Sequence, residues 1–174
     1  MSLTAINPAN GTLIEEYPTL NSETLDCQIQ AARAAQPDWQ RLTFAERAEV
    51  LRRVAEQLRE HKTRLGELMT LEMGKPVKEA GPEVEKAAWC AEHYAQHAEA
   101  YLADQSLPSD ASHSYVCYQP LGTVLGILPW NAPLWLAFRF LAPALMAGNT
   151  CVMKHDPHVP GCARAIAEMF SLAG

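Results

Sequence analysis

Hydrophobic and polar positions change their spacing several times along the chain, and each change predicts an element. The most apolar part, residues 122–154, has a β-branched and apolar run at 123–128 and a second apolar segment from Pro133 to about 146. Continuous apolar runs are typical of strands covered on both faces, and proline is favoured in the first turn of a helix. With Gly148 as the helix stop and 150–153 as a second strand, this part predicts strand, helix and strand around a parallel sheet.

The N-terminal part of the chain predicts a hairpin and then amphipathic helices. Two short extended runs, 4–7 and 12–17, surround an Asn-Gly pair that favours a hairpin. Apolar residues at three- and four-residue spacings follow, and Gly81-Pro82 should kink or restart one of the helices. The expected helices are 21 or 22 to about 35, 43 to about 74, 76 to about 104, and, at the end, 161 to 172.

Between the helical part and the sheet, residues 107–114 are polar and contain a proline, which is typical of a linker. Residues 115–118 then alternate and lead into 120–122, and we expect them to form the first arm of a long hairpin.

Two polar residues interrupt the apolar stretch and are the first functional candidates. Asn131 lies between two prolines, and Arg139 follows eight residues later. Polar groups in apolar surroundings are costly unless they meet a partner. Ligands of parallel sheets collect beyond the carboxyl ends of the strands, where Asn131 and Lys154 both fall. The four-residue spacing of Asn131, Trp135 and Arg139 predicts that they share one helix face.

Several motifs in this part of the chain occur in a fixed order. They are Pro-Trp-Asn-x-Pro at 129–133, Pro-Ala-Leu at 143–145, Ala-Gly-Asn-Thr at 147–150 and Val-x-Lys at 152–154, after Glu-Met-Gly-Lys-Pro at 72–76 and Pro-Leu-Gly at 120–122. This order resembles the aldehyde dehydrogenase superfamily over nearly the whole chain. Residues 154–163 are similar to a bacterial subgroup of succinate-semialdehyde dehydrogenases.

The resemblance implies an α/β fold in which residues 1–174 are the N-terminal part of the NAD(P)-binding domain. N-terminal helices would be followed by the start of a Rossmann-like parallel sheet that is incomplete in this chain. An arm near 114–122 would pair subunits, which implies a homodimer or homotetramer.

The resemblance also implies a role for each candidate residue. Asn131 would stabilise the oxyanion formed from an aldehyde, and Trp135 with Arg139 would contact a substrate carboxylate. Ala132 stands where many relatives have phenylalanine, which leaves room beside Arg139. The residues expected to bind NAD or NADP are Ile127, Leu128, Pro129, Trp130, Lys154, which would contact the adenosine ribose, and Pro157, which replaces a glutamate that repels a 2′-phosphate.

Structural alternatives exist for each of these roles. Asn131 could cap the helix that starts at Pro133, Arg139 could pair with an internal acid, and Lys154 could be a solvated surface lysine. Cys90, His93 and His97 share a helix spacing suited to metal ligands, but the glutamate of a His-Glu-x-x-His motif is absent. We expect a partly exposed helix face there and no metal.

Composition limits the class of protein. The chain has 174 residues, 48% hydrophobic and 20% charged, which is typical of one soluble domain. A net charge of −6 without a basic run argues against nucleic acid as partner. Glycines, prolines and Arg139 interrupt the apolar stretch, which argues against a membrane span. Five cysteines without paired-ligand spacing and no leading apolar segment predict reduced thiols in a cytoplasmic protein.

In the resembled family, the nucleophilic cysteine, the general-base glutamate and the pyrophosphate-binding turn all lie downstream of these 174 residues. None of the five cysteines matches the motif around the nucleophile. We therefore expect the full-length enzyme to oxidise an aldehyde, succinate semialdehyde to succinate, with NAD or NADP, and the 174-residue chain alone to be inactive. A truncated module that binds nucleotide or associates with subunits, and a membrane-associated protein, are the alternatives.

Overall fold

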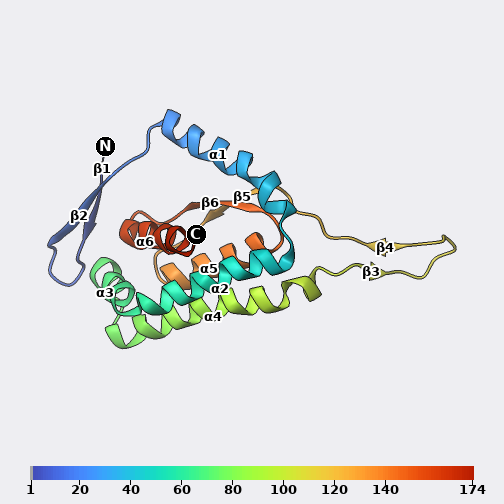
Figure 1. Ribbon diagram of the computed structural model, residues 1–174. Coiled ribbons are helices and arrows are strands. Elements are labelled where there is room, and N and C mark those ends of the chain that lie inside the picture. The colour runs from blue at the N-terminus through green and yellow to red at the C-terminus, as the bar shows by residue number, and fades with distance from the viewer. Residues whose placement is uncertain (1) are drawn as a thin grey trace.

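The computed structural model describes residues 2–174, which form helices packed on both faces of a small parallel sheet (Figure 1). The helices are α1 (Ser22–Arg41), α2 (Phe44–Glu60), α3 (Lys62–Met73), α4 (Val77–Tyr101), α5 (Pro133–Met146) and α6 (Pro160–Ala173). The strands are β1 (Ser2–Ile6), β2 (Leu13–Pro18), β3 (Gln105–Ser106), β4 (Tyr115–Val116), β5 (Thr123–Ile127) and β6 (Thr150–Lys154). Mixed helices and strands confirm the predicted α/β class.

The strand, helix and strand unit predicted from the apolar stretch is present. β5 and β6 pair in parallel, with Thr123 opposite Thr150, and α5 connects them. Helix α1 lies over one face of the pair, where the Thr150 hydroxyl donates to the Ala32 carbonyl at 2.8 Å. Helices α5 and α6 lie on the other face, below the strands in Figure 1.

The expectation that β5 is covered on both faces is wrong for these residues. Leu125 and Ile127 are 59% and 71% exposed. They point to the α1 side, and α1 packs mainly against β6, so the carboxyl half of β5 has no cover there. On the opposite face the packing is close, since a Cβ at Gly126 would lie 2.5 Å from the Phe140 ring.

Helices α2 and α4 form the layer below α5, and their facing sides build most of the core (Figure 1). The predicted long helix from 43 to 74 is wrong in one respect, because the chain leaves helical geometry at His61 and restarts as α3. Its apolar spacing continues from Leu58 to Leu65, seven residues apart, so the break is invisible in the pattern. The break turns α3 toward α4 and α6.

Two proline-based expectations are also corrected. Helix α4 does not restart at Gly81-Pro82 and runs as one element through Tyr101. Pro82 is its sixth residue, so only one hydrogen bond near the helix start is lost. Helix α1 does not end near residue 35 and continues through Pro37 to Arg41, because the Trp39 indole donates to the Leu145 carbonyl at 2.9 Å and holds the last turns.

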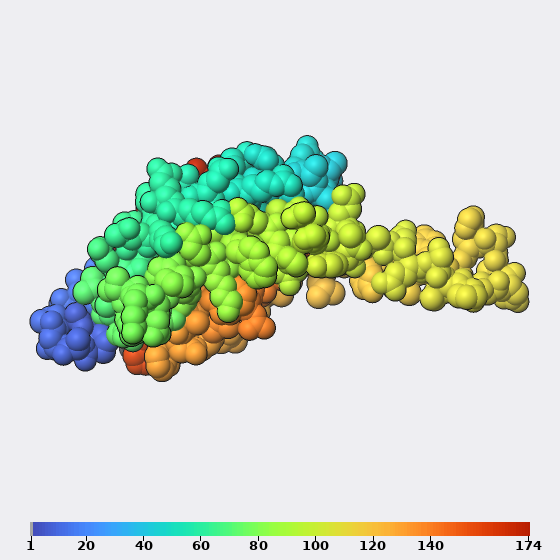
Figure 2. Space-filling model, turned by 90° about the horizontal axis from the view of Figure 1, so that it is seen from below, coloured from blue at the N-terminus to red at the C-terminus, as the bar shows by residue number. Residues whose placement is uncertain are grey.

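Strands β3 and β4 form a narrow antiparallel arm that projects from the body (Figures 1 and 2). The expectation that residues 115–118 form the first arm of this hairpin is wrong. This segment is the second arm, because its partner, Gln105–Ser106, precedes it in the chain. Residues 107–114 are the tip that joins them, closed by a hydrogen bond from the Leu107 amide to the Ser114 carbonyl at 2.7 Å.

The N-terminal hairpin is confirmed as the antiparallel pair β1–β2. Gly11, with φ of 73°, closes the turn by donating to the Asn7 carbonyl at 2.8 Å. None of the helices in residues 2–174 is both long enough and apolar enough to span a bilayer.

Candidate active site at the carboxyl edge of the parallel strands

The two parallel strands end side by side, and the candidate residues leave from that edge. Ile127 lies opposite Lys154, and the Leu128 amide donates to the Lys154 carbonyl at 3.0 Å. The loop from β5 then passes Asn131 and enters α5, while the loop from β6 passes Pro157 and enters α6. Asn131 and Lys154 therefore both lie at the carboxyl ends of the two strands, as predicted.

Asn131 lies exposed just before α5 and does not cap it. The N-terminal cap position is Ala132, and no side chain from the loop hydrogen-bonds to the helix start. The structural alternative for Asn131 is therefore not realised, and its amide is exposed to solvent.

Helix α4 supplies the cap that the loop lacks. Glu83 is 7% exposed, and its Oε1 accepts from the amides of Leu134 and Trp135 at 3.0 and 3.2 Å. Its other oxygen pairs with Lys75, which is itself mostly buried. A carboxylate at a helix N-terminus satisfies free amides and interacts favourably with the helix dipole. Glu83 therefore holds the turn that follows Asn131.

A second buried carboxylate does the same for α6. Glu72, 3% exposed, accepts from the amides of Gly161 and Cys162 at 2.7 and 2.9 Å. A side chain at Gly161 would be 2.7 Å from the Glu72 oxygen, so only glycine allows this approach. The motif at 72–76 thus places one carboxylate under α6, turns at Gly74 with φ of 75°, and supplies Lys75 to Glu83.

His155 connects the end of β6 to the start of α5. Its Nε2 lies 3.0 Å from the Pro133 carbonyl, so this nitrogen donates and carries the proton. The residue is 8% exposed, and burial is the main reason that its pKa lies below the usual value. The neutral ring therefore ties the residue next to Lys154 to the turn next to Asn131.

Arg139 and Trp135 come together one turn apart on α5, as the spacing predicted. The guanidinium carbon lies 5.7 Å from the centre of the Trp135 ring. Arg139 is exposed and, among residues 2–174, forms no ion pair within 4.0 Å. The structural alternative of a pair with an internal acid is therefore not realised among these residues.

The surface beside Lys154 suits a nucleotide. Ile127 and Trp130 are 71% and 46% exposed, and Pro129 and Pro157 are exposed as well. Lys154 is exposed and has no carboxylate partner among the described residues. Apolar side chains next to a free ammonium offer a surface for a flat base and a hydroxyl-rich sugar. The Leu128 amide is already bonded to Lys154, so it is not available to a ligand.

Three of the cysteines, Cys90, Cys151 and Cys162, lack the features of a nucleophile. Cys90 and Cys162 are buried, and burial raises the pKa of both thiols above the usual value. Burial also raises the pKa of Cys151 to about 12. An active nucleophile needs a lowered pKa and some exposure. No group of three potential metal ligands occurs in the part of the chain that is described. The Cys90 thiol donates to the Phe138 carbonyl, and the centres of the His93 and His97 rings lie 4.8 Å apart.

Several residues that hold the site together were missed by the sequence reasoning. Glu72, Glu83, His155 and Asn149 all bond to backbone groups at element ends. Asn149 accepts from the amides of Leu121 and Gly122 at 2.7 and 3.1 Å, and so fixes the entry to β5. The only available signal for Glu72, Asn149 and His155 was their presence inside or beside the motifs, which does not specify a partner far away in the chain, and Glu83 lies outside the motifs.

A parallel pair with helices on both faces and polar residues at its carboxyl edge is the arrangement in which open α/β proteins bind their ligands. The family model described as "Aldehyde dehydrogenase family" matches residues 1–174. The chain belongs to the aldehyde dehydrogenase family.

Individual relatives agree with this assignment. The chain is 43% identical over 174 residues to a Synechocystis protein named a probable NADP(+) succinate-semialdehyde dehydrogenase. It is 38% identical over 170 residues to the NAD(P)+ succinate semialdehyde dehydrogenase Sad of Escherichia coli, and these span 98% of this chain and 37% of that protein. The solved succinic semialdehyde dehydrogenase of Streptococcus pyogenes with NADP+ superposes with a TM-score of 0.94 at 29% identity, over 99% of this chain and 38% of that one.

The match covers all of this chain but only 38% of the length of the Synechocystis protein. The similarity to the relatives is therefore a similarity to their N-terminal part.

Proposed function

We propose that these residues are the N-terminal part of an enzyme that oxidises succinate semialdehyde to succinate with NAD or NADP. The arrangement of Asn131, Lys154 and Arg139 carries the proposal. An exposed amide and a free ammonium leave adjacent parallel strands at one edge, and a free guanidinium lies two turns along the helix that follows the amide. The names of the relatives support the choice of aldehyde.

Each residue has a distinct task in this proposal. The Asn131 amide donates to the oxygen of the aldehyde as it becomes an oxyanion, and one such donor is typically worth about 3 to 4 kcal/mol of barrier. Arg139, resting on Trp135, binds the carboxylate at the far end of the substrate and so orients the aldehyde. Lys154 binds ribose hydroxyls. A bound nicotinamide dinucleotide supplies the hydride acceptor.

The nucleophile and the general base belong to the remainder of the enzyme in this proposal. The raised pKa values of Cys90, Cys151 and Cys162 fit this view. We therefore expect the 174-residue chain alone to reduce no nicotinamide with succinate semialdehyde.

The experiment compares a charged and an uncharged aldehyde in the complete enzyme that contains these residues. Arg139→Ala should lower kcat/KM for succinate semialdehyde by about 2 to 4 kcal/mol in transition-state free energy, because a charge-assisted pair to the carboxylate is lost. An uncharged aldehyde of similar length should be nearly unaffected. If kcat/KM falls equally for both aldehydes while the protein stays folded, the arginine has a structural role, and the proposal of an acidic substrate loses its support.

The protruding arm favours a second role, subunit association. Strands β3 and β4 are exposed along their length in the projecting arm (Figure 2). Tyr115 in β4 and Tyr118, two residues after it, are 56% and 48% exposed. We propose that this arm contacts another subunit in a homodimer or homotetramer. Deletion of the arm tip should then lower the molecular mass in sedimentation without unfolding the body, and an unchanged mass would oppose this role.

A further inference from the structure

A second cation lies over the same tryptophan as Arg139. The ammonium of Lys86, on α4, is 4.2 Å from the centre of the Trp135 ring, and the guanidinium carbon of Arg139 is 5.7 Å from it. Both cationic side chains are exposed, whereas Trp135 is half-buried. Two helices thus bring two positive charges to one indole on the surface.

The position of Lys86 follows from contacts on either side of it along α4. One turn before, Glu83 accepts from the Trp135 amide at 3.2 Å. One turn after, the Cys90 thiol donates to the Phe138 carbonyl at 3.6 Å. Residues three and four apart lie on one helix face, so Lys86 is held between two contacts to α5 and faces it.

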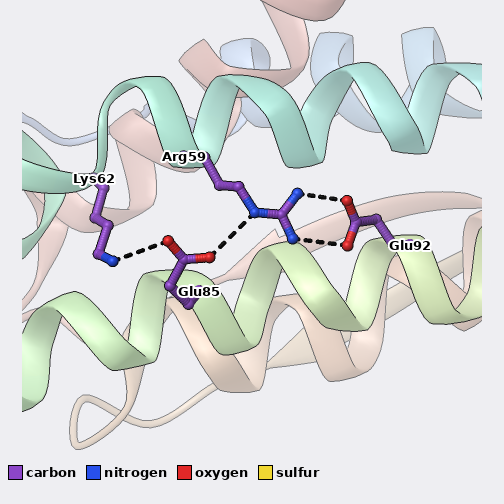
Figure 3. Close-up of polar contacts among 4 residues, drawn as sticks. All are labelled: Arg59, Lys62, Glu85 and Glu92. Carbon is purple, nitrogen blue, oxygen red and sulfur yellow. Dashed lines mark hydrogen bonds and ion pairs between the residues drawn. The ribbon is translucent and has the colours of Figure 1, made fainter.

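These two cations have no counter-charge of their own. Neither Lys86 nor Arg139 forms an ion pair within 4.0 Å in residues 2–174. The neighbouring acids of α4 are already engaged, since Glu85 and Glu92 bind Arg59, and Glu85 also binds Lys62 (Figure 3). Within the described residues, the two positive charges at this ring are therefore not neutralised by an ion pair.

The electrostatics of this cluster favour an anionic ligand between Lys86 and Arg139. An indole face attracts each cation by only about 0.5 to 1 kcal/mol at an exposed site, and like charges nearby repel each other. A carboxylate between them would accept from both groups and remove the repulsion. Arg139 offers a planar fork and Lys86 a point charge, a combination that suits one carboxylate bound by two donors.

We propose that Lys86 is a second carboxylate-binding residue, which acts with Arg139 above Trp135 to select short aldehydes with an acid group at the far end. This proposal rests on the proposed function, because it adds a residue to the same substrate site. It assigns the specificity for an anionic substrate to a pair of cations from two helices.

Binding can be measured without turnover in the complete enzyme that contains these three residues. The probe is succinate, added at constant ionic strength to that enzyme labelled with ¹⁵N in its tryptophans, with the indole signal of Trp135 as readout and Trp135→Phe to assign it. Uncharged succinamide is the control ligand. The variants are Lys86→Met, which keeps the aliphatic stem, and, as the matched control, Lys78→Met. Lys78 is exposed elsewhere on α4 and forms no ion pair among the described residues.

We expect succinate to shift the Trp135 signal and succinamide to leave that signal unchanged. Lys86→Met should weaken succinate binding about tenfold, which corresponds to the loss of one hydrogen bond to a charged group. Lys78→Met should bind as the unchanged enzyme does. No shift with succinate, or equal binding by Lys86→Met and the unchanged enzyme, would overturn the proposal.

Kinetics in the complete enzyme separate this proposal from the function on which it rests. Lys86→Met should raise KM for succinate semialdehyde and spare an uncharged aldehyde. If the enzyme oxidises succinate semialdehyde and Lys86→Met changes neither substrate, the proposed function stands and the role of Lys86 fails. If no aldehyde is oxidised although succinate binds through Lys86, the proposed function fails and the anion site remains.

Discussion

Asn131 has the exposure and the free amide that an oxyanion donor needs, because the task of capping α5 falls to another residue. If no carboxylate from another helix reached the start of α5, an asparagine at position 131 would be expected to accept hydrogen bonds from the free amides there. Glu83 occupies them instead. The amide of Asn131 therefore remains available for a ligand.

Asn131→Ala in the complete enzyme should lower the rate of the step that forms the oxyanion by about a hundredfold or more. Nucleotide binding should be nearly unchanged, because the side chain caps no helix. Single-turnover kinetics with a parallel nucleotide titration would measure both. Loss of nucleotide affinity to the same degree would indicate a structural role.

His155 makes the stability of this region depend on pH. Its pKa is lowered from 6.5 in the folded protein, mainly by burial, so the unfolded chain binds more protons at mildly acidic pH. The contribution of the neutral ring is therefore present above about pH 6.5 and decreases as pH falls toward the lower folded pKa.

We expect His155→Gln, which keeps a donor but does not titrate, to lose less stability between pH 7.5 and 5.5 than the unchanged chain. Urea unfolding at the two pH values measures the difference. His158→Gln is the control, because His158 is exposed and, among the described residues, bonds only to Asp156 in its own loop. An equal pH dependence in His155→Gln and the unchanged chain would contradict the assignment.

At the scale of elements, helix starts are held by carboxylates from other helices. Glu72 on α3 holds α6 and Glu83 on α4 holds α5, and these two helices follow the two parallel strands. The loops that carry the candidate residues therefore end at anchored turns. This arrangement explains why the motif at 72–76, far from Asn131 in the chain, accompanies the site motifs.

Glu83→Ala should destabilise the protein by about 3 to 5 kcal/mol, because it leaves two amides without partners and the mostly buried Lys75 without its counter-charge. The matched control is Glu85→Ala, two residues along the same helix. Its pairs with Arg59 and Lys62 are more than a third exposed (Figure 3), so about 0 to 1 kcal/mol is expected. Urea unfolding midpoints of the two variants test the contrast, and similar losses would refute it.

At the scale of the whole molecule, an apolar groove of ≈ 950 Å³ lies between α1, β6 and α6. Leu20, Trp39, Met153, Ile166 and Phe170 are among its lining residues. Helix α1 has no fully buried residue, although its apolar side faces this groove. Within the described residues β6 pairs only with β5, so one of its edges is free as well.

Open apolar surface and a free strand edge favour association. We expect the 174-residue chain alone to associate as its concentration rises, or to lose fixed packing. Ala167→Glu, which places a charge in the groove, should reduce the association, while Ser171→Glu, exposed on α6 and outside the groove lining, should not. Sedimentation velocity over a range of concentrations measures this. A monomer with a sharp, concentration-independent thermal transition would contradict the expectation.

The sequence alone determined the local elements and the motif-bearing edge of the sheet. The apolar run with Pro133 and Gly148 at its helix ends predicted β5, α5 and β6, and the motifs predicted the family. These signals are local, because period, proline and glycine act within a few residues of themselves. For the same reason the expected end of α1 before Pro37 is wrong, and α4, whose expected extent is confirmed, does not restart at Pro82.

Only the tertiary structure decided which distant residues meet. Glu83 lies 51 residues from the amide it caps, and Glu72 lies 89 residues from Gly161. Lys86 reaches Trp135 for the same reason, since α4 packs against α5. Burial then determines how much each contact matters, because a carboxylate enclosed by two helices has no water to replace a lost partner, whereas a surface pair does.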